Sequence, residues 1–241
     1  MKAAASILVA AFVVALSGCA GAPQKPIAVE PAFWQDRQAV IGVAGEKMPE
    51  ADAEMVGGQG LLDIAINRGN AGKMIEQLKK LNVDRAAAIP GNLSDALTRR
   101  GFKVEKLPAL DVVALPEFKA EANPELYAAR DFRSLAGKGF DRLLVVSVEK
   151  IGTTRTYHGF IPTSAPRALF AARGQLVDLK TNKLIWYDRH QTTAAIAEPW
   201  DQEPDFPNVS SAVLKNMADG AALLERSLFA SPAAASAEKS Q

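Results

Sequence analysis

Arg142-Leu-Leu-Val-Val-Ser-Val148 is the stretch of sequence that decides the fold. Its aliphatic run lies between Gly139 and Gly152 and has no polar residue on either face until Ser147. An uninterrupted apolar run of this kind is typical of a central strand that is covered on both faces. The rest of the chain must therefore supply neighbouring strands and packed layers for it.

Two further strands are expected after this one, at residues 168–177 and 183–193. They are joined by Asp178-Leu-Lys-Thr-Asn-Lys183, in which Asn182 is expected to adopt the left-handed backbone conformation of a tight hairpin. Strands this close in sequence can pair as antiparallel neighbours.

The first half of the chain alternates strands with helices. Strands are expected at 38–44 and 102–107, while 45–60 is expected to be a loop. Helices are expected at 61–67, at 74–81, from a cap at Asn92 or Ser94 to Gly101, and from Asn123-Pro124 to about Gly137. A last helix is expected from a cap at Asn208 or Ser210.

The resulting order, β-α-α-β-α-β-β-β-α, predicts the fold class. Helices between the early strands require crossover connections, whereas the last three strands can form hairpins. We therefore expect one α/β (α+β) domain with a mixed β-sheet and helices packed on it.

The composition excludes several classes of protein. The 241 residues include 28 Lys and Arg against 27 Asp and Glu, a balance that argues against a nucleic-acid-binding protein. The single cysteine excludes an internal disulfide and a Cys-rich zinc site. No cofactor and no metal are expected.

The N-terminus explains the cysteine. Met1-Lys2 is followed by an apolar run that ends in Leu16-Ser17-Gly18-Cys19, which is the organisation of a secretory signal. The run is shorter than the roughly 20 residues that a permanent membrane-spanning helix needs. Leu16-Ser17-Gly18-Cys19 resembles the bacterial lipobox, which implies cleavage before Cys19 and its lipidation. Ala20, where retained lipoproteins have Asp, implies the outer membrane.

The remaining chain divides into three further parts. Residues 19–37 hold the lipidated Cys19 and a proline-rich tether, with Phe33 and Trp34 expected to dock on the domain. Residues 38–229 are the expected periplasmic α/β domain. Residues 230–241 are small and polar and are expected to be a disordered tail.

The second half of the chain also resembles a known group of proteins. The motifs are Leu135-Ala-Gly-Lys-Gly-Phe-Asp-Arg-Leu-Leu-Val-Val-Ser-Val148, then Ala171-Ala-Arg-Gly-Gln-Leu-Val-Asp-Leu-Lys-Thr-Asn-Lys-Leu-Ile-Trp186, then a late amphipathic helix. This pattern is similar to the envelope lipoproteins grouped with the curli-secretion lipoprotein, the TolB amino-terminal domain and the lipoprotein activators of penicillin-binding proteins. The chain has Asn182 where that pattern usually has Gly, and it lacks the long amphipathic hairpins of the pore-forming members.

Catalytic motifs are weak. Asp188 and His190 lie two apart on an expected strand and so share a face, and Ser147 could complete a triad with them. No nucleophile-elbow motif surrounds Ser147, and no zinc-binding spacing includes either histidine. A hydrolase is thus the third of three hypotheses.

Residues 153–166 are expected to be a loop longer than a hairpin needs, and long loops are often functional. This segment carries Arg155, Tyr157, Phe160 and Ile161, and a second long segment carries Trp200. Aromatic residues and arginine are typical of protein contact sites. The alternative is that Phe160 and Ile161 fold back onto the core.

These observations predict an outer-membrane lipoprotein, anchored on the periplasmic side through Cys19, that binds an envelope protein as an accessory or assembly factor. It is expected to be a binding protein and not an enzyme. The alternative is a homo-oligomeric secretion-channel subunit.

Overall fold

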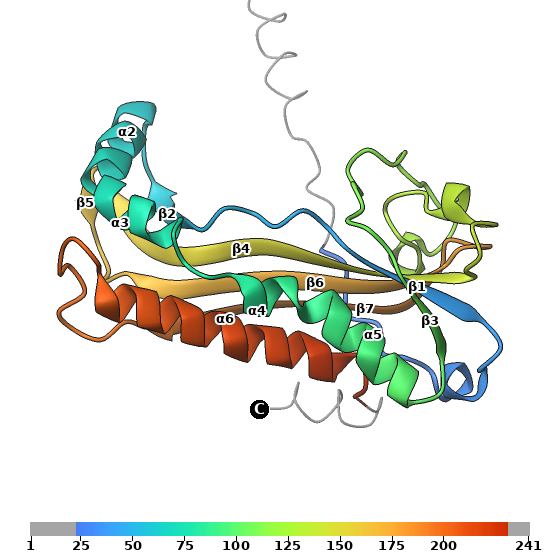
Figure 1. Ribbon diagram of the computed structural model, residues 1–241. Helices are drawn as coiled ribbons and strands as arrows, with labels where there is room; N and C mark the ends of the chain where they lie inside the picture. Colours follow the sequence, from blue (N-terminus) through green and yellow to red (C-terminus); the bar gives the residue numbers. More distant parts are fainter. Residues whose placement is uncertain (1–22, 231–241) are drawn as a thin grey trace, which may run out of the picture.

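A mixed sheet forms the centre of the protein (Figure 1). The computed structural model describes residues 23–230, so the expected signal peptide, the lipobox with Cys19 and the tail from 231 onward lie outside the described residues. The strands are β1 (Val40–Gly45), β2 (Asp52–Gly58), β3 (Lys103–Lys106), β4 (Arg142–His158), β5 (Ile161–Pro162), β6 (Arg167–Asp178) and β7 (Leu184–Ala195). Their order is β3-β1-β4-β6-β7, and β2 and β5 also pair with β4.

The sheet combines parallel and antiparallel pairs, as expected. β1 runs parallel to β3 and β4, and β2 runs parallel to β4, whereas β4, β6 and β7 are antiparallel neighbours. Parallel neighbours need crossover connections, and the connection from β1 to its parallel neighbour β3 contains β2 and four helices. The helices are α2 (Leu61–Asn70), α3 (Gly72–Leu78), α4 (Asp84–Ala87), α5 (Ile89–Arg99) and α6 (Pro207–Ser227). The predicted fold class, a single α+β domain, is confirmed.

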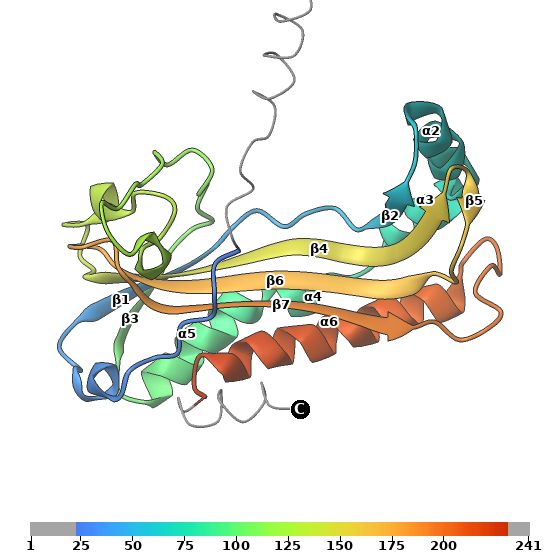
Figure 2. The same cartoon turned by 180° about the vertical axis from the view of Figure 1, so that it is seen from behind.

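The two faces of β4 are covered by different layers, which confirms it as the central strand. Leu144 and Val146 belong to a core cluster that includes residues of α5 and α6. Leu143 and Val145 belong to a second cluster, which the irregular segment 107–140 covers. All four side chains are at most 2% exposed. We call the face opposite α4, α5 and α6 the helix-free side, because no α-helix covers it and α2 projects only from its end (Figures 1 and 2).

The folded part of the chain begins before the expected boundary at residue 38. Ile27 and Tyr187 exchange two backbone hydrogen bonds, of 2.8 and 3.0 Å, at the outer edge of β7. Val29 is 1% exposed. The prediction that 19–37 is wholly a tether is therefore wrong for its second half, because the apolar side chains among the prolines pack on the domain.

Phe33 and Trp34 dock on the domain as expected. Phe33 lies in the 3-10 turn η1 (Pro31–Gln35), and its ring centroid is 5.1 Å from that of Phe102. The Trp34 ring centroid is 5.8 Å from that of Phe229, beyond the end of α6. The two aromatic residues thus join the N-terminal segment to the end of the last helix.

Two helices begin earlier than the predicted caps. α5 begins at Ile89, so that Asn92 and Ser94 lie inside it, and α6 begins at Pro207, so that Asn208 and Ser210 lie in its first turn. Both helices have a proline in the first turn. A proline fits there because the backbone N–H groups of the first turn have no partner within the helix.

Residues 45–60 are not simply a loop, because they contain β2. This strand pairs in parallel with the far half of β4, from Asp52 opposite Gly152 to Gly58 opposite His158. The approach is close: a Cβ added at Gly152 would lie 1.9 Å from the Asp52 carbonyl oxygen. β2 contains Asp52, Glu54 and two terminal glycines, so it has no apolar run that would mark it as a strand without its partner.

Residues 123–137 do not form the expected helix. They contain only the 3-10 turns η2 (Pro124–Leu126) and η3 (Arg133–Leu135), and Asn123 has φ +49. The backbone bonds to other segments instead: Ala128 donates to the Asn182 carbonyl at 3.1 Å, and Ala129 accepts from Phe118 at 2.9 Å. Tertiary pairing overrides a helical spacing of apolar residues here.

Residues 153–166 are likewise not a loop. β4 continues to His158 after a bulge between Val148 and Lys150, and β5 follows after a turn. The strand extends because both of its edges find partners, β2 on one side and β6 on the other.

Candidate functional site

At one end of the sheet, α2 and the β4–β5 hairpin rise together on the helix-free side (Figure 1). Asn67 ties them by donating its side-chain amide to the carbonyl oxygen of Gly159 at 3.1 Å and to the Gln59 side chain at 2.8 Å. We call the exposed aliphatic and aromatic residues of this projection the apolar tip. They are Leu61, Leu62, Ile64, Ile66, Phe160 and Ile161.

Phe160 and Ile161 are 58% and 56% exposed. The alternative that they fold back onto the core is therefore wrong. Phe160 lies in the turn between β4 and β5, and Ile161 begins β5, which pairs with the end of β4.

The other predicted contact residues lie together in a separate place. Arg155, Tyr157 and Trp200 line a cavity of about 230 Å³, to which Lys73 and Glu203 also contribute. The Arg155 guanidinium lies 4.8 Å from the Trp200 ring centroid and 5.8 Å from that of Tyr157. It also donates to the Ser164 carbonyl at 2.8 Å, which fixes its position between the rings. We call this hollow the Trp200 pocket.

The Trp200 pocket has the chemistry of a recognition site. An arginine held over two aromatic rings presents a flat cationic surface, and aromatic residues with arginine carry much of the binding energy at protein interfaces. Lys73 and Glu203 pair with each other at its rim. The structure thus divides the predicted contact residues into the Trp200 pocket and the apolar tip.

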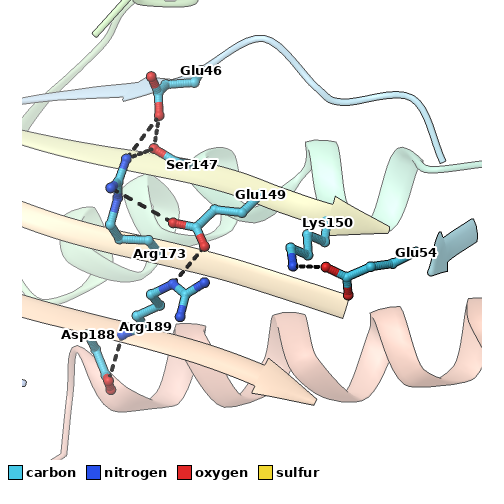
Figure 3. Close-up of polar contacts among 8 residues, drawn as sticks. All are labelled: Glu46, Glu54, Ser147, Glu149, Lys150, Arg173, Asp188 and Arg189. Atoms are coloured by element: carbon cyan, nitrogen blue, oxygen red, sulfur yellow. Dashed lines mark hydrogen bonds and ion pairs between the residues drawn. The ribbon is translucent and has the colours of Figure 1, made fainter. Parts of the chain in front are cut away.

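A network of charged side chains crosses the helix-free side between the two ends of the sheet (Figure 3). Ser147, Arg173 and Arg189 lie in one row across β4, β6 and β7. The Arg173 guanidinium lies 3.5 Å from a carboxylate oxygen of Glu46 and 3.8 Å from one of Glu149, and Arg189 donates to Glu149 at 2.7 Å.

Ser147 belongs to this network and makes no hydrogen bond to Asp188 or His190 within residues 23–230. Its hydroxyl donates to the Glu46 carboxylate and accepts from Arg173 at 3.3 Å. Partial burial raises the pKa of Glu46 above its usual range, although the positive charge of Arg173 opposes that effect.

Asp188 and His190 share a face, as predicted, but it is the opposite face from that of Ser147. The His190 Nε2 lies 3.0 Å from an Asp188 carboxylate oxygen. Burial acts to raise the pKa of Asp188, but the neighbouring His190 and Ser227 side chains outweigh burial and keep that pKa below its usual range. Because side chains alternate along a strand, residues on either side of Arg189 point away from its row. The hydrolase triad is therefore not assembled.

Neither a candidate metal cluster nor a candidate membrane-spanning helix is found among the described residues. Within residues 23–230, no group of three or more His, Cys, Asp or Glu side chains is placed to hold a metal ion. In the same range, no helix is both long enough and apolar enough to cross a membrane.

Comparisons with known proteins give a likeness in structure only. No family model matches the chain, and no curated protein matches its sequence. Similar solved structures include the PelC dodecamer from Paraburkholderia phytofirmans, with 9% identity, 80% of this chain and 93% of that chain covered, and a TM-score of 0.31. Protein XCC0632 from Xanthomonas campestris has 10% identity, coverage of 84% and 91%, and a TM-score of 0.37. Lipoprotein GNA1162 from Neisseria meningitidis has 16% identity, coverage of 75% and 97%, and a TM-score of 0.30. A bacterial lipoprotein is thus among the similar structures.

Sequence reasoning missed the α2 half of the apolar tip and the charged network. A signal for the first was present, since Asp63 and Asn67 are four apart and share one helix face while Leu61, Leu62 and Ile66 lie away from it. The network had no comparable signal, because its residues come from separate strands and meet only through the register of the sheet.

Proposed function

We propose that this chain is a bacterial lipoprotein, held on the periplasmic side of the outer membrane by acyl chains on Cys19, that works by binding a partner protein of the envelope. The observation that carries the anchor is the position of the single cysteine, directly after Leu16-Ser17-Gly18 at the end of an apolar run. Multiple acyl chains would make the attachment stable, where one chain would bind only reversibly.

The Trp200 pocket supports the binding role. It is a hollow lined by aromatic rings, an arginine and an ion pair, and it lies about 40 Å along the sheet from the N-terminal segment, at roughly 3.3 Å for each strand residue. A partner can therefore reach the pocket without displacing the anchored end of the domain. Phe160 lies at the same end of the protein but outside the pocket, which makes it a suitable control.

Cys19→Ser is expected to release the protein from the membrane fraction. The change removes the thiol that lipidation requires and alters nothing in residues 23–230. Fractionation of cells that express the full-length chain would measure the effect, with Ala20→Asp as the control. That control keeps Cys19 and should stay membrane-bound but leave the outer membrane. Recovery of Cys19→Ser in the membrane fraction would contradict a lipid anchor.

Trp200→Ala is expected to abolish photo-crosslinking of an envelope partner to a probe placed at position 70, an exposed residue that lines the pocket. Trp200 is only partly exposed and stacks on Arg155, so its removal opens the pocket and frees the guanidinium. Phe160→Ala should leave the crosslink unchanged. Equal crosslinking in both variants would show that the pocket is not the contact site, and crosslinks between copies of this chain alone would indicate the oligomeric alternative.

A further inference from the structure

The helix α2 buries a polar side chain and exposes apolar ones, the reverse of the usual arrangement. Asn67, a polar residue, is 1% exposed and faces the protein, while Leu61 and Leu62 are 89% and 73% exposed. Asp63 also turns inward, where its carboxylate accepts the Gly60 N–H at 2.8 Å. The helix is therefore held by its polar face, and its aliphatic side chains are the ones presented outward.

The exposed apolar area is large for a water-soluble surface. At roughly 200 Å² for a whole large apolar residue, the apolar tip presents about 700 Å², whereas the largest patch on a typical monomer is about 300–600 Å². Its residues come from two neighbouring elements that Asn67 ties together. A surface of this size and composition is expected to be covered in the working protein.

The described chain begins on the side to which the apolar tip rises (Figures 1 and 2). Gln24 donates its side-chain amide to the Glu125 carbonyl at 2.7 Å, which places the start of the chain beside η2 on the helix-free side. The remaining large apolar residues that are exposed in residues 23–230, Val113 and Leu126, belong to the segment 107–140 that covers this same face. Within residues 23–230, the large apolar side chains that are exposed are thus confined to one side of the molecule or to the end that rises toward it.

We propose that the apolar tip lies in the surface of the same bilayer that holds the Cys19 lipid, so that the domain rests on the membrane with its helix-free side down. This inference rests on the proposed lipid anchor. Only three residues lie between Cys19 and Pro23, and the four Cα–Cα steps reach about 14 Å at most, so the start of the domain is kept close to the bilayer. The tip, about 40 Å away along β4, then gives a second point of contact.

The composition of the tip favours lipid over a protein partner. Its members are Leu, Ile and Phe, and it contains none of the Trp, Tyr and Arg that dominate protein hot spots. The basic residue of α2, Arg68, is paired with Asp52 at 3.2 Å, so contact with the bilayer should depend little on attraction to anionic headgroups and should be insensitive to salt.

The test places a fluorescent probe at Leu62 of the lipidated, full-length protein. The Cys19 sulfur is consumed by lipidation, so Leu62→Cys introduces a unique thiol for an environment-sensitive fluorophore. The protein is reconstituted in vesicles of phosphatidylethanolamine and phosphatidylglycerol, with and without bromine on the acyl chains. Ser211→Cys, exposed on α6 at the opposite side, is the matched control.

We expect the emission maximum of the probe at position 62 to shift to shorter wavelength, and brominated lipid to quench most of its fluorescence. The probe at position 211 should show neither effect. Flotation of the vesicles reports the anchor separately: protein that does not float contradicts the proposed function, and this inference with it. Protein that floats with an unquenched probe at 62 overturns the inference alone. A shift that appears only when envelope proteins are added would assign the tip to a protein partner and would also overturn it.

Discussion

Gly174→Ala is expected to destabilise the protein by about 3 kcal/mol or more, as overpacking does when the neighbouring group cannot move. A Cβ at this position of β6 would lie 2.2 Å from Cη2 and 2.3 Å from Cζ3 of the Trp186 ring. Trp186 is 1% exposed and packed in the core between the sheet and α6. The indole cannot withdraw without leaving a cavity or disturbing β7.

Denaturant unfolding followed by circular dichroism would measure this loss. Gly58→Ala is the control, because a Cβ there meets nothing within 4 Å and the residue is exposed on β2. Gly174→Ala combined with Trp186→Leu should recover part of the loss, since neighbouring substitutions in one packing site are not additive. A wild-type midpoint for Gly174→Ala would show that the indole does not lie over this glycine.

Asn182→Gly is expected to cost about 2–4 kcal/mol, even though glycine accepts the backbone conformation, φ +64, at this hairpin. The Asn182 side chain is completely buried. Its amide nitrogen donates to the carbonyls of Ala128 and Arg130 at 3.1 and 3.0 Å, and its oxygen accepts from the Phe132 N–H at 2.9 Å. Glycine would leave these three backbone groups without that partner.

Asn182→Asp separates the hydrogen bonds from the shape of the side chain. Its second carboxylate oxygen would face two carbonyl oxygens, so burial and repulsion should raise the pKa of the new carboxyl above its unfolded value. The penalty should therefore be largest at neutral pH and shrink as the pH falls through the raised folded pKa, where the protonated group can donate once more. Thermal melting of wild type, Asn182→Gly and Asn182→Asp across this range would check both expectations. A loss for Asn182→Asp that does not depend on pH would contradict them.

The comparison at Asn182 shows how far sequence reasoning reaches. Its left-handed conformation is a local property and was predictable from Asp178-Leu-Lys-Thr-Asn-Lys183. Its role as the residue that fixes segment 123–137 depends on backbone groups about 50 residues away, and no local pattern reports that. For the same reason the helix expected at 123–137 was wrong, although its apolar spacing is helical.

The same distinction between local sequence signals and long-range contacts holds for other parts of the fold. The burial of β4 on both faces could be predicted because the apolar run itself is the signal. The β2 strand could not be predicted, because it has no apolar run and is defined by its pairing with the far half of β4. Pro90 and Pro207 mark the starts of α5 and α6 in the sequence, because proline is favoured in the first turn of a helix. They are better markers here than the nearby cap residues.

The candidate site was visible from sequence only as a set of residue types. Arg155, Tyr157 and Trp200 stood out as aromatic and cationic residues in segments expected to be loops, but their stacking across more than 40 residues of chain required the sheet. Whether they bind a partner stays a prediction.

The route of the N-terminal segment has a mechanical consequence. The chain passes the outer edge of β7, where Ile27 holds Tyr187, and then runs to the aromatic contacts of Trp34 with Phe229 (Figure 2). Any tension along the chain from its N-terminal side therefore loads the two hydrogen bonds at Ile27 first and the aromatic contact at the end of α6 next. The outermost strand and the last helix bear that force, while β4 in the middle of the sheet is shielded from it.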